Sequence, residues 1–261
     1  MAESFGTDAE RYDRARPRYP EALIERIAAV AAAAPAGPRP DVLDVGCGTG
    51  IVTRQFQAAG CRVLGIDPDA RMAGLARQFG GEVEVARFEE WDPAGRDFDA
   101  VVAGQAWHWV DPAAGAAKAA RVLRPGGLLA PFWNVFRFPP DVAEAVAVAC
   151  QRALPDTPFD FRAMTNGSRD VCRTPFAKVA DGMRESGEFS EPEHWEFDWE
   201  FFYTRDAWLD LMPTTGAFTR LPPDRMGKVL EGVGTVIDAM GGGFTMRYTT
   251  VAVTVVRAGA A

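Results

Sequence analysis

The stretch 41-DVLDVGCGTGIVTRQF-56 constrains the fold more than any other part of the sequence. An apolar strand pattern at 41–45 runs into glycines 46, 48 and 50, and a helical pattern follows at 49–59. A strand that turns into a helix through glycines is typical of nucleotide-binding α/β sheets. Around it, the hydrophobic pattern predicts helices at 20–34, 69–78 and 111–123, and strands at 62–66, 82–86, 98–103 and 127–133. This alternation predicts a parallel sheet with helices on both faces.

The second half of the chain has a different pattern. Residues 134–190 are irregular, with a predicted helix at 141–154 between proline-rich turns. The run 194-HWEFDWEFFY-203 alternates strictly, which predicts a half-buried antiparallel strand. Its apolar face would carry Trp195, Phe197, Trp199, Phe201 and Tyr203. A helix at 223–240 and a strand at 244–256 complete the predicted elements.

Charge and composition exclude several classes of protein. The chain has 261 residues, 48% of them apolar and 25% charged, which is ordinary for a globular protein. Its net charge of -8 disfavours a nucleic-acid partner, although a local basic patch would still allow one. The cysteines have no metal-like spacing with one another or with the two histidines, so we expect no bound metal. We also expect the thiols to be reduced. The residues concerned are Cys47, Cys61, Cys150, Cys172, His108 and His194.

The N-terminal residues and the most apolar segment bear on localisation. Residues 1–14 are polar and charged where a signal peptide would have an apolar run. The run 27-IAAVAAAA-34 is too short to span a bilayer. We therefore expect a soluble, cytoplasmic protein, as a monomer or a homodimer.

Two carboxylates indicate which nucleotide the glycine turn holds. Asp44 precedes the glycines at the end of its strand, where it would oppose a pyrophosphate but attract an ammonium group. Asp67 ends the next strand, about 20 residues past the first glycine, at the spacing of a ribose-binding carboxylate. It could instead cap the helix that follows Pro68. A ligand with adenosine at one end and an amino acid at the other would suit both residues.

Four spaced motifs then resemble a known family. The segments VLDVGCGTG, GIDPD, FDAVVAGQAWHWVD and ARVLRPGGLLA, in this order, resemble the class I S-adenosylmethionine-dependent methyltransferases. With 12-YDRARPRYP-20 ahead of the core, the chain is similar to the small-molecule enzymes of the trans-aconitate methyltransferase type. The resemblance covers residues 10–135. It implies a Rossmann-like, mostly parallel sheet of seven strands in the order 3-2-1-4-5-7-6, with the last strand antiparallel and a helical cap.

The resemblance also implies the residues that bind S-adenosylmethionine. Asp67 would hold the ribose hydroxyls and Met72 would pack on the adenine. Many relatives carry an aspartate where this chain has Arg87, so the adenine hydrogen bond would come from Glu89 or from the backbone. The remaining positions follow the glycine turn, strand three and strand four: Asp44, Gly46, Cys47, Gly48, Gly50, Phe88, Gln105 and Ala106.

The segment before the core resembles a lid over the cofactor. By this resemblance Tyr12 and Arg16 would close the site, and the guanidinium of Arg16 could pair with the cofactor carboxylate. The alternative is a solvated basic stretch, because Arg11, Arg14 and Arg18 are close in sequence.

The acceptor site is less determined by the sequence. Trp133 and Asn134 directly follow a strand at its ligand-binding end, and we expect them, with Trp109 and Trp208, to contact a small apolar or aromatic acceptor. His108 could act as a general base, brace its loop, or contact the acceptor. Of the tryptophans beside it, 107 and 109, one should pack inward and the other border the pocket.

The predicted organisation is a single methyltransferase domain. Its parts are an N-terminal cap (1–40), a cofactor-binding core (41–135), a substrate-side cap (136–192 and 204–240) and closing strands (193–203 and 244–256). Methyl transfer to oxygen, nitrogen or carbon is the expected reaction. Other reactions with the same cofactor, or a non-catalytic cofactor-binding subunit, stay open because fold does not fix reaction. A nicotinamide dehydrogenase fits the GxGxG turn and Asp44 poorly.

Overall fold

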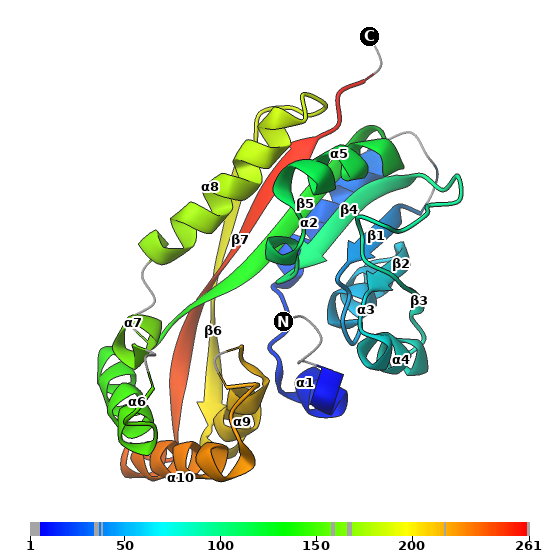
Figure 1. Ribbon diagram of the computed structural model, residues 1–261. Coiled ribbons are helices and arrows are strands. Elements are labelled where there is room, and N and C mark those ends of the chain that lie inside the picture. The colour runs from blue at the N-terminus through cyan, green and yellow to red at the C-terminus, as the bar shows by residue number, and fades with distance from the viewer. Residues whose placement is uncertain are drawn as a thin grey trace.

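A seven-stranded sheet runs through the whole molecule (Figure 1). The computed structural model describes residues 6–33, 37, 39–157, 160–165, 169–216 and 218–259. The strand order is β3-β2-β1-β4-β5-β7-β6, and β7 runs antiparallel to both of its neighbours. This confirms the predicted order. The strands are β1 (Asp41–Val45), β2 (Arg62–Asp67), β3 (Glu82–Val85), β4 (Phe98–Gly104), β5 (Leu123–Arg137), β6 (Glu193–Thr204) and β7 (Gly243–Val256).

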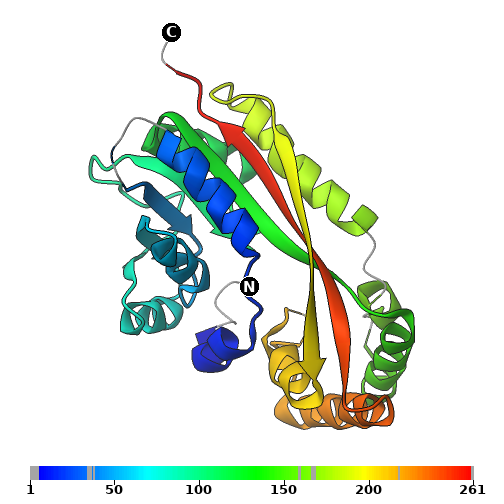
Figure 2. The same ribbon diagram turned by 180° about the vertical axis from the view of Figure 1, so that it is seen from behind.

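Helices cover both faces of the sheet and both ends of its long strands (Figures 1 and 2). The α-helices are α1 (Ala9–Ala15), α2 (Glu21–Ala33), α3 (Ile51–Ala58), α4 (Ala70–Gln78), α5 (Pro112–Val122), α6 (Pro140–Ala153), α7 (Phe161–Thr165), α8 (Arg169–Glu185), α9 (Arg205–Leu211) and α10 (Pro223–Ala239). Two short 3₁₀ turns are η2 (Trp107–Trp109) and η3 (Met212–Thr214). None of the helices in the described ranges has the length and apolar run that crossing a bilayer requires.

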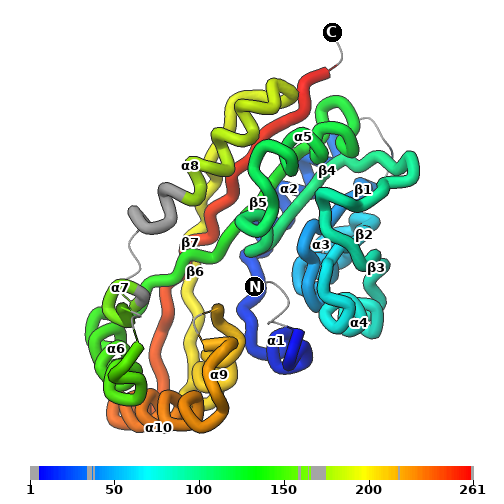
Figure 3. The backbone as a smooth tube through the Cα atoms, viewed as in Figure 1, coloured from blue at the N-terminus to red at the C-terminus, as the bar shows by residue number. Residues whose placement is uncertain are grey.

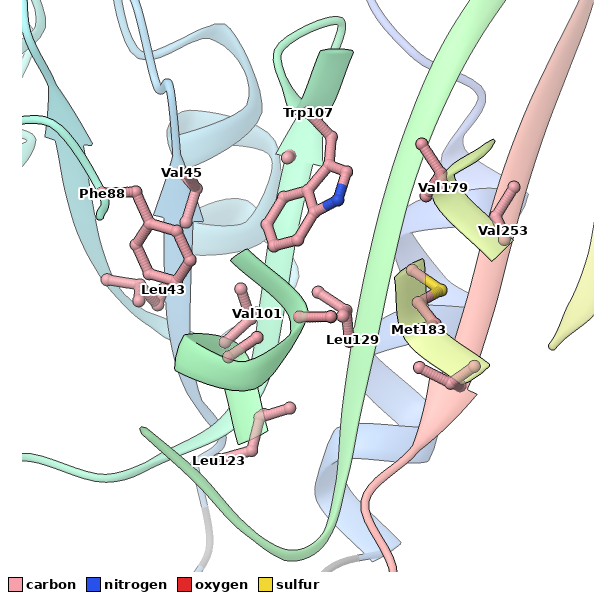
Figure 4. Packing of buried hydrophobic residues seen from close by; sticks show 14 of the residues in the cluster. Leu43, Val45, Phe88, Val101, Trp107, Leu123, Leu129, Val179, Met183 and Val253 are labelled. Carbon is pink, nitrogen blue, oxygen red and sulfur yellow. The ribbon is translucent and has the colours of Figure 1, made fainter. Parts of the chain in front are cut away.

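Two buried clusters sandwich the parallel half of the sheet. On one face, α5 and α8 pack on Leu43, Val101 and Leu129, with Trp107 among them (Figure 4). On the other face, α2 and α3 pack on alternate residues of the same strands, such as Val42 and Val102. Because successive strand residues point to opposite faces, an almost continuous apolar run supplies both clusters. This explains why the first half was readable as a parallel sheet.

The three strands β5, β7 and β6 are much longer than the others and continue past the parallel half (Figure 3). At their far end, α6, α9 and α10 enclose a third cluster, which includes Val142, Trp208, Val233 and Phe244. We call this part the distal lobe. The distal lobe therefore has a buried core of its own. It shares its strands with the sheet, so it is an extension of the same sheet.

Candidate functional site

A cavity of about 530 Å³ opens at the carboxyl ends of the parallel strands. Its floor is formed by the last residues of β1, β2 and β4, namely Val45, Asp67 and Gly104. The cavity is thus at the edge of the sheet where α/β proteins bind ligands. Its volume lies in the usual range for small-molecule sites.

The glycine turn brings bare backbone to this cavity. Gly46 and Gly48 line it and have φ values of 69° and 56°, a left-handed conformation that favours glycine. A Cβ at Gly46 would lie 2.5 Å from the Cβ of Ala106, so the turn and β4 approach closely here. Gly50 starts α3 in the left-handed conformation with φ 82°, and it is not among the residues lining the cavity. Gly46 and Gly48 therefore lie where the resemblance puts cofactor-binding glycines, and Gly50 shapes the turn.

Asp67 presents a carboxylate at the floor of the cavity. One oxygen accepts a hydrogen bond from the backbone N–H of Gly48 (2.9 Å) and the other from that of Asp69 (2.8 Å). Burial raises the pKa of Asp67, and the two backbone donors oppose that rise. The residue that caps α4 is Asp69, whose side chain accepts from Arg71 N. The alternative reading of Asp67 as the helix cap is therefore wrong.

Asp44 lies behind the glycine turn and is fully buried. One carboxylate oxygen accepts from the hydroxyl of Thr53 (2.7 Å), and the other has no partner within the described residues. Burial raises the pKa of Asp44 to about 7, while Thr53 opposes the rise. A buried carboxylate with one unsatisfied oxygen is costly unless a cation or donor approaches it. Asp44 is not among the residues that line the main cavity.

The wall beyond Asp67 is apolar with a polar rim. Met72 and Phe88 line the cavity and are 5% and 3% exposed. Arg87 and Glu89 flank them, and the Glu89 carboxylate accepts from the backbone N–H of Asp111 (3.2 Å). An apolar slot with polar groups at its edge suits a flat heterocycle.

A smaller cavity adjoins the main one beneath the lid. Cys47, Gln105 and Asn134 line it, and Gln105 also lines the main cavity with Ala106. Gln105 has a φ of 55° and donates from its side chain to the carbonyl of Asn134 (3.3 Å). Burial raises the pKa of the Cys47 thiol well above its usual range, so this cysteine stays protonated and unreactive.

The lid is helix α1 with the residues that follow it. Tyr12 and Arg16 line both cavities, and the Arg16 guanidinium lies 4.9 Å from the Tyr12 ring. Arg16 also donates to the carbonyl of Thr214 in the distal lobe, and its Nε is buried with no partner within the described residues. The reading of this segment as a solvated basic stretch does not fit, because Arg11 and Arg14 both pair with Asp210 of α9.

A second ion-pair group fastens the lid to the glycine turn. Asp13 accepts from the hydroxyl of Thr49 (2.7 Å) and from Arg54 (2.5 Å). The lid therefore spans from the glycine turn to α9. Sequence reasoning missed Asp13, Thr49, Arg54 and Asp210 as residues that position the site. Only Thr49, inside the glycine motif, offered a sequence signal, because the others meet their partners from distant parts of the chain.

Another part of the cavity wall is formed by η2, which follows Ala106. His108 and Trp109 line it, and their rings lie 4.7 Å apart. Trp107 packs inward with 1% exposure, while Trp109 is 43% exposed at the cavity. Trp133 does not line the cavity but donates from its indole N–H to Nδ1 of His108 (3.2 Å). Burial lowers the pKa of His108.

The other two expected acceptor contacts have different positions. Asn134 lines the smaller cavity and accepts at its side-chain oxygen from the hydroxyl of Thr250 (2.6 Å). Trp208 lies in the core of the distal lobe, in edge contact with Phe138 and Phe244. It lines neither cavity, so its expected contact with the acceptor does not fit the structure. A tryptophan in an aromatic-rich sequence is more often core than ligand contact.

Comparison with known proteins identifies the class to which this site belongs. Residues 43–130 match the family described as "Methyltransferase domain". Residues 43–130 are therefore similar to a methyltransferase domain, and they lie within the seven-stranded sheet described above. Nothing in these comparisons distinguishes the trans-aconitate group, so that narrower resemblance stays a prediction.

Particular relatives extend the match on either side of that domain. An uncharacterised methyltransferase of Mycobacterium tuberculosis is 38% identical over 136 residues, which is 51% of this chain and 53% of the relative. A malonyl-[acyl-carrier protein] O-methyltransferase of Enterobacter lignolyticus is 37% identical over 136 residues, 50% of this chain and 51% of the relative. The chain thus spans about half the length of the curated relatives it matches.

One solved structure is similar along nearly the whole chain. A putative type II methyltransferase from Anaeromyxobacter dehalogenans superposes with a TM-score of 0.62 at 26% identity, covering 92% of this chain and 97% of that one. The similarity includes the distal lobe because it covers more than the first half.

Proposed function

We propose that the protein transfers a methyl group from S-adenosylmethionine to a small molecule. The observation that carries the proposal is the Asp67 carboxylate, fixed by two backbone N–H groups beside the bare glycine turn of a methyltransferase domain. An adenosine ribose needs such a pair of acceptors close to exposed backbone. A dinucleotide pyrophosphate would meet the buried Asp44 behind the same turn, which disfavours it.

The residues around the cavity fit the proposed cofactor end by end. Asp67 would hold the ribose hydroxyls, and the apolar slot of Met72 and Phe88 would take the adenine. At the methionine end, the unsatisfied oxygen of Asp44 would attract the ammonium group. The unsatisfied Nε of Arg16 would pair with the carboxylate. The cofactor supplies a methyl group already activated on a sulfonium, so this chain has to bind, orient and exclude water.

The acceptor would enter between η2 and the lid. His108, Trp109, Tyr12 and Arg16 line the cavity together with Gly216 from the segment after η3. Three of these residues, His108, Trp109 and Tyr12, have aromatic rings, and Arg16 adds a charged group. Such a lining suits a small molecule that combines an apolar body with a polar group. The relatives include a malonyl-[acyl-carrier protein] O-methyltransferase and a ubiquinone biosynthesis O-methyltransferase, which differ in acceptor, so the acceptor is proposed from the cavity alone.

Three of the cysteines, Cys47, Cys61 and Cys150, are buried free thiols. This supports the proposed cytoplasmic setting, where thiols stay reduced. A small-molecule partner, with the protein as a monomer or homodimer, completes the proposal. Size-exclusion chromatography with light scattering measures the oligomeric state directly.

Radiolabelled S-adenosylmethionine tests the proposal. Calorimetry should show binding of the cofactor and of its demethylated product, and no competition by NAD or ATP. Incubation with a panel of small acids, phenols and amines should move the labelled methyl group to at least one acceptor. Binding without any transfer would favour a non-catalytic subunit, and consumption of cofactor without methylated product would favour another reaction. Absence of binding would overturn the proposal.

A further inference from the structure

Trp133 and His108 form a hydrogen bond that determines the state of the imidazole. The indole nitrogen can only donate, and it lies 3.2 Å from Nδ1 of His108. Nδ1 must therefore present its lone pair to Trp133. In a neutral imidazole one nitrogen accepts and the other carries the proton, so the proton of His108 is on Nε2.

We propose that Trp133 is a positioning residue that holds His108 as a hydrogen-bond donor, through Nε2–H, to the acceptor substrate. His108 then cannot serve as the general base, because its basic lone pair on Nδ1 is occupied and faces away from the reacting group. This inference rests on the proposed methyl transfer for its functional meaning, but the state of the imidazole can be measured without any substrate.

Trp133 is itself held in place. It is 7% exposed and belongs to β5, whose register with β7 places it opposite Val251. Its ring lies 5.0 Å from that of Phe176 on α8. On the other side of the imidazole, the Trp109 ring lies 4.7 Å away. Because the donor is fixed by a strand and a helix, the imidazole has little freedom to rotate.

The surroundings keep His108 neutral. Burial lowers its pKa. The charged groups that line the same cavity are Arg16, Asp67, Arg87 and Glu89. None of these four contributes to the shift in the pKa of His108. Protonation of Nδ1 would also point its new N–H at the N–H of Trp133. Repulsion between these two donors further favours the neutral imidazole.

A donor at this position restricts the class of acceptor. The group that faces Nε2 must offer a lone pair, as a carboxylate, a carbonyl or a phenolate oxygen does. An acceptor whose hydroxyl must lose its proton at the moment of transfer would receive no help from His108. We therefore expect substrates whose oxygen is ionised or unprotonated before they bind.

The two-histidine composition of the chain makes a direct test practical. Nitrogen NMR of histidine-labelled full-length protein reports which imidazole nitrogen carries the proton, and His194→Gln assigns the two residues. His194 is exposed on β6. The expected result is His108 with its proton on Nε2 at neutral pH. A wild-type His108 protonated on Nδ1 would overturn the inference.

Trp133→Phe removes the donor and keeps an aromatic ring in the core. We expect a mixture of His108 tautomers, a pKa nearer its ordinary value, and a loss in turnover of about two- to tenfold at nearly unchanged cofactor affinity. Trp195→Phe is the matched control, since Trp195 is also 7% exposed and its indole donates to Glu193 instead. An unchanged His108 tautomer and pKa in Trp133→Phe would overturn the positioning role.

The pH profile of turnover separates the donor from a base. His108→Gln keeps a hydrogen-bond donor but removes the base. A loss of less than about tenfold, with no loss of an acidic limb in the pH profile, supports the donor role. A base role predicts a loss of about 10² to 10⁴ and disappearance of that limb, which would overturn it. If wild-type protein transfers no methyl group at all, the proposed function fails, while the NMR result still decides the state of His108.

Discussion

The two walls of the cavity are built in opposite ways. The wall proposed to hold the cofactor comes from residues within 45–89, and its main contacts are backbone groups and one carboxylate fixed by backbone. The wall proposed to hold the acceptor comes from three distant segments, α1, η2 and the residues after η3. Ion pairs hold α1 to α9, and one indole–imidazole hydrogen bond holds η2 to β5.

This difference has a physical consequence for how each wall responds to substitution. A turn fixed by glycine conformation and strand pairing has no alternative arrangement, so a substitution that distorts the backbone of this turn should cost stability and cofactor binding together. Segments joined by part-exposed ion pairs can separate at little cost, since such pairs contribute roughly 1 kcal/mol or less. The acceptor wall should therefore tolerate change and open more readily.

The largest effect should come from Asp44, at the back of the cofactor wall. Its pKa in the folded protein is about 7, above its usual value of 3.8, so the folded state favours the neutral acid. Stability from this group is then fully present below about pH 4 and lost as pH rises through about 7. The difference corresponds to about 4 kcal/mol at higher pH.

Asp44→Asn should remove that loss. We expect the variant to be more stable than wild type at pH 9, with the gain vanishing near pH 4, while its cofactor affinity falls. Denaturant unfolding at a series of pH values measures the stability, and calorimetry measures the cofactor affinity. Thr53→Val is the matched control, because it removes the hydroxyl that favours ionised Asp44 and should steepen the loss. Parallel stability curves for wild type and Asp44→Asn would contradict the prediction.

Gly46→Ala should have the next largest effect. The new Cβ would lie 2.5 Å from that of Ala106, and the residue would keep a φ of 69°. Together the overlap and the left-handed conformation should cost about 2–4 kcal/mol of stability. In the double variant with Ala106→Gly, the overlap is relieved and only the conformational part should remain. If the double variant were no more stable than Gly46→Ala, close approach to β4 would not be the cause.

Asp67→Ala should weaken cofactor binding by about 1–3 kcal/mol, because ribose hydroxyls would lose their acceptors inside the protein. Calorimetry with the demethylated cofactor product gives the value without turnover. Asp69→Ala is the control, since it removes the cap of α4 and the pair with Arg71 outside the cavity lining. Equal losses of affinity in the two variants would mean that Asp67 acts through the turn and does not contact the ribose.

The same division explains what could be predicted from the sequence. The strands and helices of the first half follow from apolar runs and glycine turns, and the predicted limits agree with α2 to β4 within a few residues. The cofactor wall was readable because its residues stand at fixed distances from one motif. Cys47, Asp44 and Gly50 lie in that motif but outside the main cavity, and spacing alone cannot distinguish lining residues from those behind them.

The acceptor wall and distal lobe were less readable. Helix α8 was missed because Pro175 lies inside it and its residues have mixed polarity. Helix α1 has only seven residues, and it is held by its N-cap Asp8 and by ion pairs to distant residues. Trp208 and Trp109 are the same residue type, yet one is core and the other borders the cavity. The difference comes from what each residue packs against in the folded protein, since Trp208 is on α9 and Trp109 is on η2.

The smallest effect should come from Asp210, which fastens the lid to the distal lobe. Its carboxylate pairs with Arg11 and Arg14 at 2.8 and 2.9 Å, and it is 26% exposed. Asp210→Asn should therefore cost less than about 1 kcal/mol of stability. Loss of the pair should instead raise the fraction of time that α1 is open. We expect faster hydrogen exchange in α1, a few-fold rise in KM for the acceptor, and little change in exchange at α3 or β1.

Glu200→Gln, which breaks an exposed pair with Arg247 away from the lid, is the matched control. Bound cofactor product and acceptor should slow exchange in α1 and in residues 204–216 of wild type. If exchange in α1 were the same in both variants, the lid would be held by Asp13 and the glycine turn alone.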